Sequence, residues 1–142
     1  MRISRYNPVN MSLISGDITG IDFGSIRLGT FCNQTVVIKP VAESENLTSI
    51  GLYMEDRGNL NHTRFGVYKS HTATQGIAPG DARLNSFFNE APGVSDYNQY
   101  TGYRITLDPN DPEYTWLDAK PGMNETTFGA STLNFRFVFE YN

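Results

Sequence analysis

The sequence has little of what helices and membrane spans require. Its 142 residues include only three lysines and seven alanines, so good helix formers are scarce. No stretch approaches the ~20 consecutive apolar residues of a membrane-spanning helix. In contrast, glycine, asparagine, threonine and proline make up about a third of the chain, and 17 residues are Phe or Tyr. The composition therefore predicts a β-rich protein with many turns, at the length of a single domain.

Cysteine and positive charge are also scarce. The single cysteine, Cys32, excludes an intramolecular disulfide and cannot alone form a zinc site, so we interpret it as an inert, half-buried thiol. The formal net charge of −4 argues against nucleic acid as a partner, because phosphate binding depends on Lys and Arg. The N-terminal residues lack the apolar run of a secretion signal. We expect no nucleic-acid or membrane partner and no export by that route.

No motif in the sequence assembles a catalytic set. Neither a Gly-x-Ser-x-Gly elbow nor a phosphate-binding Gly-x-x-x-x-Gly-Lys loop occurs. His62 and His71 lack the spacing of a metal-binding pair, and we interpret them as surface histidines in loops. Two carboxylates facing each other in a cleft would be needed for a hydrolase, and nothing in the sequence selects a pair among the fifteen acidic residues. We therefore expect a protein that is not an enzyme and that uses no cofactor or metal.

One acidic loop offers oxygen ligands of the kind that Ca²⁺ prefers. It contains Asp108, Asn110, Asp111 and Glu113, together with two prolines. The prolines and the missing EF-hand glycine favour a solvated turn, because Asp-Pro and Asn are common turn residues. Whether this loop holds a calcium ion is left open.

Short runs rich in Ile, Val, Phe and Tyr predict the strands. We expect them at 18–23, 25–28, 34–39, 47–54, 65–69, 103–107, 113–119 and 133–141. The last run alternates Leu133, Phe135, Phe137 and Phe139 with mostly polar residues, as a strand with one buried face does. Residues 1–16 are polar and irregular and are interpreted as an N-terminal arm, followed by a single β domain over 17–142.

Residues 70–102 form an insertion too long for a hairpin loop. Within it, Asp81 is placed to cap a short helix running to about Glu90. Tyr97, Tyr100 and Tyr103 follow at intervals of three residues. Exposed aromatic rings supply rigid contact area, so these tyrosines and Trp116 are candidate partner-contact residues. The alternative is that the tyrosines cover the core beneath the long loop.

Residues 17–54 resemble the start of immunoglobulin-like domains of the ASPM–SPD-2–Hydin and choice-of-anchor type. The matching positions are Asp22, Phe23, Gly24, Ile26, Gly29, Gln34, Thr35, Val36 and Ile38. Pro40 departs from the pattern, because it stands where an Asn-Thr-Gly turn usually begins. The resemblance implies an all-β, immunoglobulin-like antiparallel β-sandwich in which Phe23 fills the interior and Gly24 and Gly29 allow the chain to turn between sheets.

The resemblance implies adhesive or structural work rather than catalysis. We expect a structural interaction protein, most specifically a bacteriophage virion component such as a capsid decoration (cement) or tail protein, made in the host cytoplasm. Its partners would be the major capsid or tail protein, in a homo-oligomer or in repeated copies. One alternative is a carbohydrate or cell-surface binding module, with Trp116 and Tyr97 or Tyr100 stacking on sugars. A small hydrolase is the third.

Overall fold

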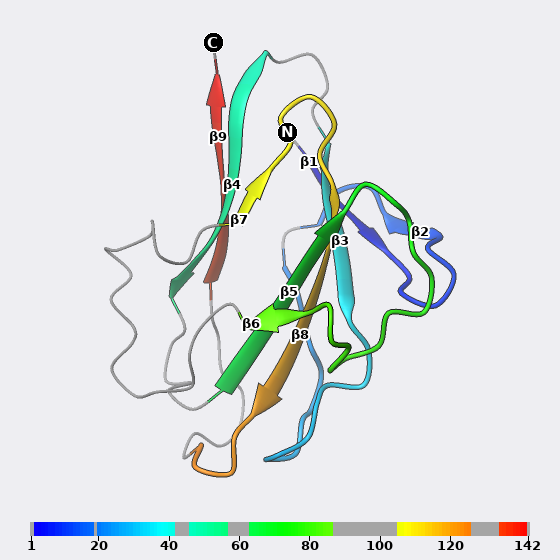
Figure 1. Cartoon of the computed structure of the whole chain (residues 1–142), viewed down its shortest axis with the longest axis vertical. Helices are drawn as coiled ribbons and strands as arrows, with labels where there is room; N and C mark the ends of the chain where they lie inside the picture. Colours follow the sequence, from blue (N-terminus) through cyan, green and yellow to red (C-terminus); the bar gives the residue numbers. More distant parts are fainter. Residues whose placement is uncertain are drawn as a thin grey trace.

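The chain folds into antiparallel β-sheets, as the composition predicts. The computed structural model describes residues 2–18, 20–41, 46–56, 63–86, 105–125 and 134–141. These residues hold nine strands in two sheets and no helix (Figure 1). In this part of the chain there is accordingly no helix long and apolar enough to cross a membrane. The expected all-β class is confirmed.

The larger sheet has six strands in the order β2-β1-β3-β8-β5-β6. Their bounds are Leu13–Ser15 (β2), Arg2–Tyr6 (β1), Val36–Val41 (β3), Tyr114–Pro121 (β8), Thr63–Ser70 (β5) and Asn85–Ser86 (β6). The smaller sheet has the order β7-β4-β9, with bounds Ile105–Leu107 (β7), Leu47–Asp56 (β4) and Asn134–Tyr141 (β9). Every pair of neighbouring strands is antiparallel. Six of the expected strands thus exist as β3, β4, β5, β7, β8 and β9, with slightly shifted ends.

The six-stranded sheet has apolar side chains packed on both of its faces. Because successive residues of a strand point to opposite faces, β3 sends Val36 and Ile38 into one cluster and Val37 into another. The first cluster also contains Leu52 of β4, so the two sheets meet across a shared core. The second contains Trp116 of β8 and lies beneath the loop that follows β5. The central strands are therefore buried from both sides.

Over the described residues 18 and 20–28, the expected strands at 18–23 and 25–28 are absent. These residues are irregular, yet their apolar side chains, Phe23 among them, pack against the first cluster, and the Phe23 and Phe65 ring centroids are 6.3 Å apart. The N–H of Gly24 donates to Asp22 Oδ1 at 2.8 Å, and both Gly24 and Gly29 have positive φ (79° and 75°). Local turn chemistry overrides the β-branched composition of this segment.

Residues 2–6 and 13–15 of the expected N-terminal arm are strands of the larger sheet. Strand β1 pairs with β3 along its whole length, from Arg2 opposite Val41 to Tyr6 opposite Val37. Strand β2 then pairs back onto β1. The polar residues of β1 alternate with a few that pack inward, such as Ile3. A half-buried strand next to the sheet edge needs no more apolar residues than that.

The expected helix from Asp81 is also absent over residues 81–86. A turn places the N–H of Leu84 on the carbonyl of Asp81 at 2.9 Å, and strand β6 follows. Leu84 is buried in the second cluster, and Asn85–Ser86 pair with Gly66 and Val67 of β5. Tertiary pairing with the open edge of β5 outweighs the helix-capping signal at Asp81. Residues 87–90 of the expected helix lie outside the described residues.

Candidate functional site

Trp116, one of the expected partner-contact residues, does not lie on the surface. Trp116 is fully buried in the middle of β8, with ring centroids 5.4 Å from Tyr68 and 6.1 Å from Tyr114. It is therefore a core residue and not a contact residue. Its burial also removes the tryptophan from the proposed sugar-stacking strip. Tyr97, Tyr100 and Tyr103 lie outside the described residues, so their role stays a prediction.

Exposed apolar side chains gather instead at the N-terminal edge of the six-stranded sheet. Leu13 and Ile14 of β2 are 59% and 56% exposed, and Val9 in the preceding turn is 62% exposed. We call these three residues the apolar edge. Strand β2 is the outermost strand of its sheet, and in the described part of the chain only β1 pairs with it. The edge of β2 that faces away from β1 thus presents backbone groups together with exposed apolar side chains.

The turn between β1 and β2 is fixed by its own sequence. The side chain of Asn7 accepts the N–H of Val9 at 2.9 Å, and that of Asn10 accepts the N–H of Ser12 at 2.9 Å. Met11 adopts a φ of 59°, which is uncommon outside glycine, and packs against the second apolar cluster. The turn holds the exposed side chains of the apolar edge in place.

The loop after β5 supports the same turn from outside. The N–H of Gly76 donates to the carbonyl of Pro8 at 2.9 Å, and Gln75 Nε2 donates to the carbonyl of Asn10 at 3.2 Å. These bonds join residues far apart in the sequence. The apolar edge is therefore presented on an ordered hairpin, which lowers the entropy cost of binding a partner.

The edge is short, but it lacks several other features that usually prevent sheet edges from pairing. Edge strands are commonly protected by lysine, proline, inward-pointing charges or a covering loop. Strand β2 has the sequence Leu13-Ile14-Ser15 and carries none of these residues. A row of backbone groups beside exposed apolar side chains is the arrangement that accepts an added strand. Strand β2 is thus chemically suited to pairing with a strand of another chain.

Sequence reasoning missed the apolar edge, although a signal for it exists. Two short runs containing Ile and Leu, at residues 3 and 13–14, flank an Asn-Pro turn. Strand, turn and strand at this spacing indicate a hairpin. The polar composition of residues 1–16 as a whole hid that local pattern.

His71 and the acidic loop meet in space, which their separation in the sequence does not suggest. His71 Nε2 lies 3.4 Å from Asp108 Oδ2, 3.6 Å from Glu113 Oε1 and 3.9 Å from Asp111 Oδ2. His71 is about half exposed, as expected of a loop histidine, whereas Glu113 is buried. His62 lies outside the described residues.

Hydrogen bonds within the acidic loop confirm the expected turn chemistry. The N–H of Asp108 donates to both carboxylate oxygens of Glu113 at 3.0 and 3.1 Å, and Asp108 Oδ1 accepts the N–H of Asn110 at 2.9 Å. The bond from Asn110 is the main reason that the pKa of Asp108 falls below its usual value, with a smaller contribution from His71.

Cys32 has the surroundings of an unreactive thiol. It is buried, its Sγ lies 3.3 Å from the carbonyl oxygen of Gln34, and burial raises its pKa. A raised pKa leaves little nucleophilic thiolate at neutral pH. This agrees with the interpretation made from the sequence.

Comparison with known proteins gives no relative. No family model, no curated protein and no solved structure matches the chain. The functional argument therefore depends on the geometry of the chain itself.

Proposed function

We propose that this chain is a non-enzymatic structural interaction protein that joins neighbouring copies of itself through the apolar edge. The observation that carries the proposal is an outermost strand without lysine, proline or charge, whose Leu13 and Ile14 are each more than half exposed. In an antiparallel pair related by a two-fold axis, β2 of one copy lies against β2 of the next. The six-stranded sheet then continues from one copy into the other.

A contact of this kind is weak when it occurs once. Strand β2 has only three residues, so few backbone hydrogen bonds form across the pair. Burial of the apolar edge adds about 25 cal/mol per Å² of apolar surface removed from water. Weak contacts become strong when many copies engage at once in a repeated assembly. The proposal therefore favours a protein that works in many copies.

The assembly that we propose is a bacteriophage virion, with the chain as a decoration or tail protein. The support is the likeness of residues 17–54 to immunoglobulin-like sandwich modules, together with two antiparallel sheets that share an apolar core. In this proposal the chain is an immunoglobulin-like sandwich that also contacts the major capsid or tail protein. Mass spectrometry of purified virions tests this step: the chain should be present in many copies, and its absence would contradict the virion assignment.

Size-exclusion chromatography with light scattering tests the self-association. The wild-type chain should show a mass that rises with concentration above the 15.9 kDa of one chain. The double substitution Leu13→Asp/Ile14→Asp should remain at the monomer mass at every concentration, because like charges would then meet across the pair on each face of the joined sheet.

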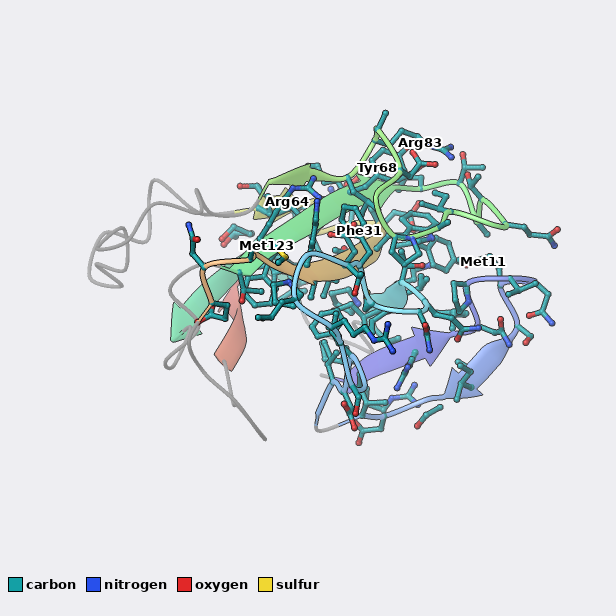
Figure 2. The ribbon with its side chains drawn as sticks, turned by 90° about the horizontal axis from the view of Figure 1, so that it is seen from below. Met11, Phe31, Arg64, Tyr68, Arg83 and Met123 are labelled. Carbon is teal, nitrogen blue, oxygen red and sulfur yellow. The ribbon has the colours of Figure 1, made fainter. Side chains whose placement is uncertain are left out.

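Met123→Asp is the matched control for this experiment. Met123 is 75% exposed, and it lies on the opposite side of the molecule from Met11 and the β1–β2 hairpin (Figure 2). This variant should associate like the wild type. A wild-type chain that stays monomeric at high concentration, or equal loss of association in both variants, would overturn the proposal.

A further inference from the structure

We propose that His71, Asp108 and Glu113 bind one divalent transition-metal ion of the Zn²⁺ class. The three side chains offer ligand atoms that all lie within 4.8 Å of one another. They come from the ends of three strands: His71 follows β5, Asp108 follows β7 and Glu113 precedes β8. None of these three residues belongs to the apolar edge, so the inference does not depend on the proposed association.

The distances in the cluster suit a shared ion better than direct hydrogen bonds. His71 Nε2 is 3.4 Å from Asp108 Oδ2 and 3.6 Å from Glu113 Oε1, whereas a charged hydrogen bond is about 2.7–2.9 Å long. Two ligand atoms that bind one zinc ion at about 2.1 Å in tetrahedral geometry lie about 3.4 Å apart. Small movements of the side chains therefore place an ion at bonding distance from all three residues.

The main-chain carbonyl of Asp111 holds the imidazole over the loop. His71 Nε2 lies 2.8 Å from this oxygen, which is a hydrogen bond when Nε2 carries the proton. Metal binding requires the neutral tautomer with its proton on Nδ1, so the ion would replace this bond. The carboxylate of Asp111 lies 3.9 Å from Nε2 and is largely exposed, which places it at the rim of the site.

Charge gives an independent reason to expect a cation. The Glu113 side chain is only 9% exposed, and in the described part of the chain no Arg or Lys forms an ion pair with it or with Asp108. Two other described acids do face an arginine, because Asp118 lies near Arg64 and Asp81 binds Arg83. Carboxylates that converge on one imidazole with no Arg or Lys among them leave a negative site, and buried charge of this kind is stabilised by a bound cation.

The donor set identifies the class of metal. One imidazole nitrogen with carboxylate oxygens is typical of Zn²⁺ and its first-row neighbours, whereas Ca²⁺ and Mg²⁺ are bound almost entirely through oxygen. Such an ion would link the end of β5, in the larger sheet, to the connection that runs from β7 of the smaller sheet to β8. Because the ligands meet only in the folded chain, metal binding would stabilise the fold.

Titration calorimetry and thermal unfolding with ZnCl₂ test the inference on the full chain after treatment with a chelator. We expect one binding site per chain and a rise in Tm of roughly 5–10 °C when free Zn²⁺ is about a hundredfold above Kd. Ca²⁺ and Mg²⁺ should give a much smaller rise. His71→Ala and Glu113→Gln should each weaken Zn²⁺ binding at least about tenfold.

Two variants serve as matched controls. His62→Ala removes the other histidine, and Asp17→Asn removes an exposed acid of the same charge outside the cluster. Both should bind Zn²⁺ as the wild type does. The Tm values of all variants in EDTA show whether each one folds.

A measurement on the unmodified chain guards against variants that fail to fold. The ¹⁵N resonances of the His71 imidazole should shift on addition of one equivalent of Zn²⁺. No binding by the wild type, a loss in His62→Ala equal to that in His71→Ala, or tighter binding of Ca²⁺ that does not need His71 would overturn the assignment.

Discussion

The central strands and the N-terminal edge of the six-stranded sheet use similar residues in opposite ways. In β8, six of the eight residues are buried, whereas in β2 two of the three are exposed and the third is intermediate. Apolar residues are present in both strands. What differs is the neighbourhood, because β8 has a strand on each side and packing on both faces, and β2 has a strand on one side only. Position in the sheet thus decides whether an apolar residue supports the fold or is available to a partner.

The largest effect should come from emptying the second apolar cluster. Trp116→Ala leaves a cavity beneath Tyr68 and Tyr114 and should lower the free energy of unfolding by about 3–5 kcal/mol, measured by urea denaturation. Trp116→Phe keeps most of the ring volume and should lose clearly less. A loss below about 1 kcal/mol for the alanine variant would contradict the central role assigned to β8.

Adding a single methyl group between β5 and β8 should have the next largest effect. A Cβ at Gly66 would lie 2.3 Å from Asp118 Oδ1 and 3.3 Å from Leu84 Cβ. Asp118 is fully buried and its Oδ2 accepts the N–H of Gly80, so it has little room to move. Gly66→Ala should therefore lower the free energy of unfolding by about 1–3 kcal/mol.

Gly20→Ala is the control for that prediction. Gly20 has no atom within 4 Å of an added Cβ and no positive φ. The unfolding free energy of the Gly20→Ala variant should differ from that of the wild type by no more than about 0.5 kcal/mol. Equal losses in the two glycine variants would show that the crowding at Gly66 is not the cause.

The same substitutions that abolish association should leave the monomer stable. Leu13→Asp/Ile14→Asp changes only side chains that are already exposed on β2. We expect the unfolding free energy of the monomer to change by about 0.5 kcal/mol or less, in urea denaturation at low protein concentration. A loss as large as that of Trp116→Ala would mean that β2 belongs to the core after all.

The smallest effect should come from the exposed ion pair in the turn before β6. Hydrogen bonds from Arg83 lower the pKa of Asp81 to about 2. A carboxylate with a depressed pKa contributes stability at neutral pH, and that contribution is lost as the pH falls from about 4 toward 2. Asp81→Asn should therefore be slightly less stable than the wild type at pH 6, and the difference should shrink at pH 2.5. A difference that does not change with pH would contradict the pairing.

The sequence predicts the central strands well because their cause is local. Alternation or continuous apolar runs in β3 and β5 and in residues 50–52 of β4 reflect burial of one or both faces, and that pattern is readable along the chain. Residues 18 and 20–28 have a similar composition but form no strand, and their apolar side chains pack as irregular chain. Whether a segment pairs with a neighbouring strand depends on the tertiary structure, which composition does not specify.

The candidate sites were less predictable for the same reason. The exposure of Leu13 and Ile14 depends on β2 being last in the sheet, which the spacing of apolar residues does not specify. His71 and Asp108 meet because the strands that precede them end at the same place, although they are far apart in the sequence. Trp116 was misassigned because a lone aromatic residue between turns can equally belong to a core or to a surface.

Amide hydrogen exchange at low and high protein concentration tests the central contrast most directly. Amides of β3 and β8 should exchange slowly at both concentrations, because they open only with global unfolding. Amides of Leu13–Ser15 should exchange quickly in the dilute monomer and become protected in the concentrated protein. Protection that appears elsewhere in the concentrated protein, with β2 still exchanging quickly, would contradict the assignment of β2 as the edge where copies join.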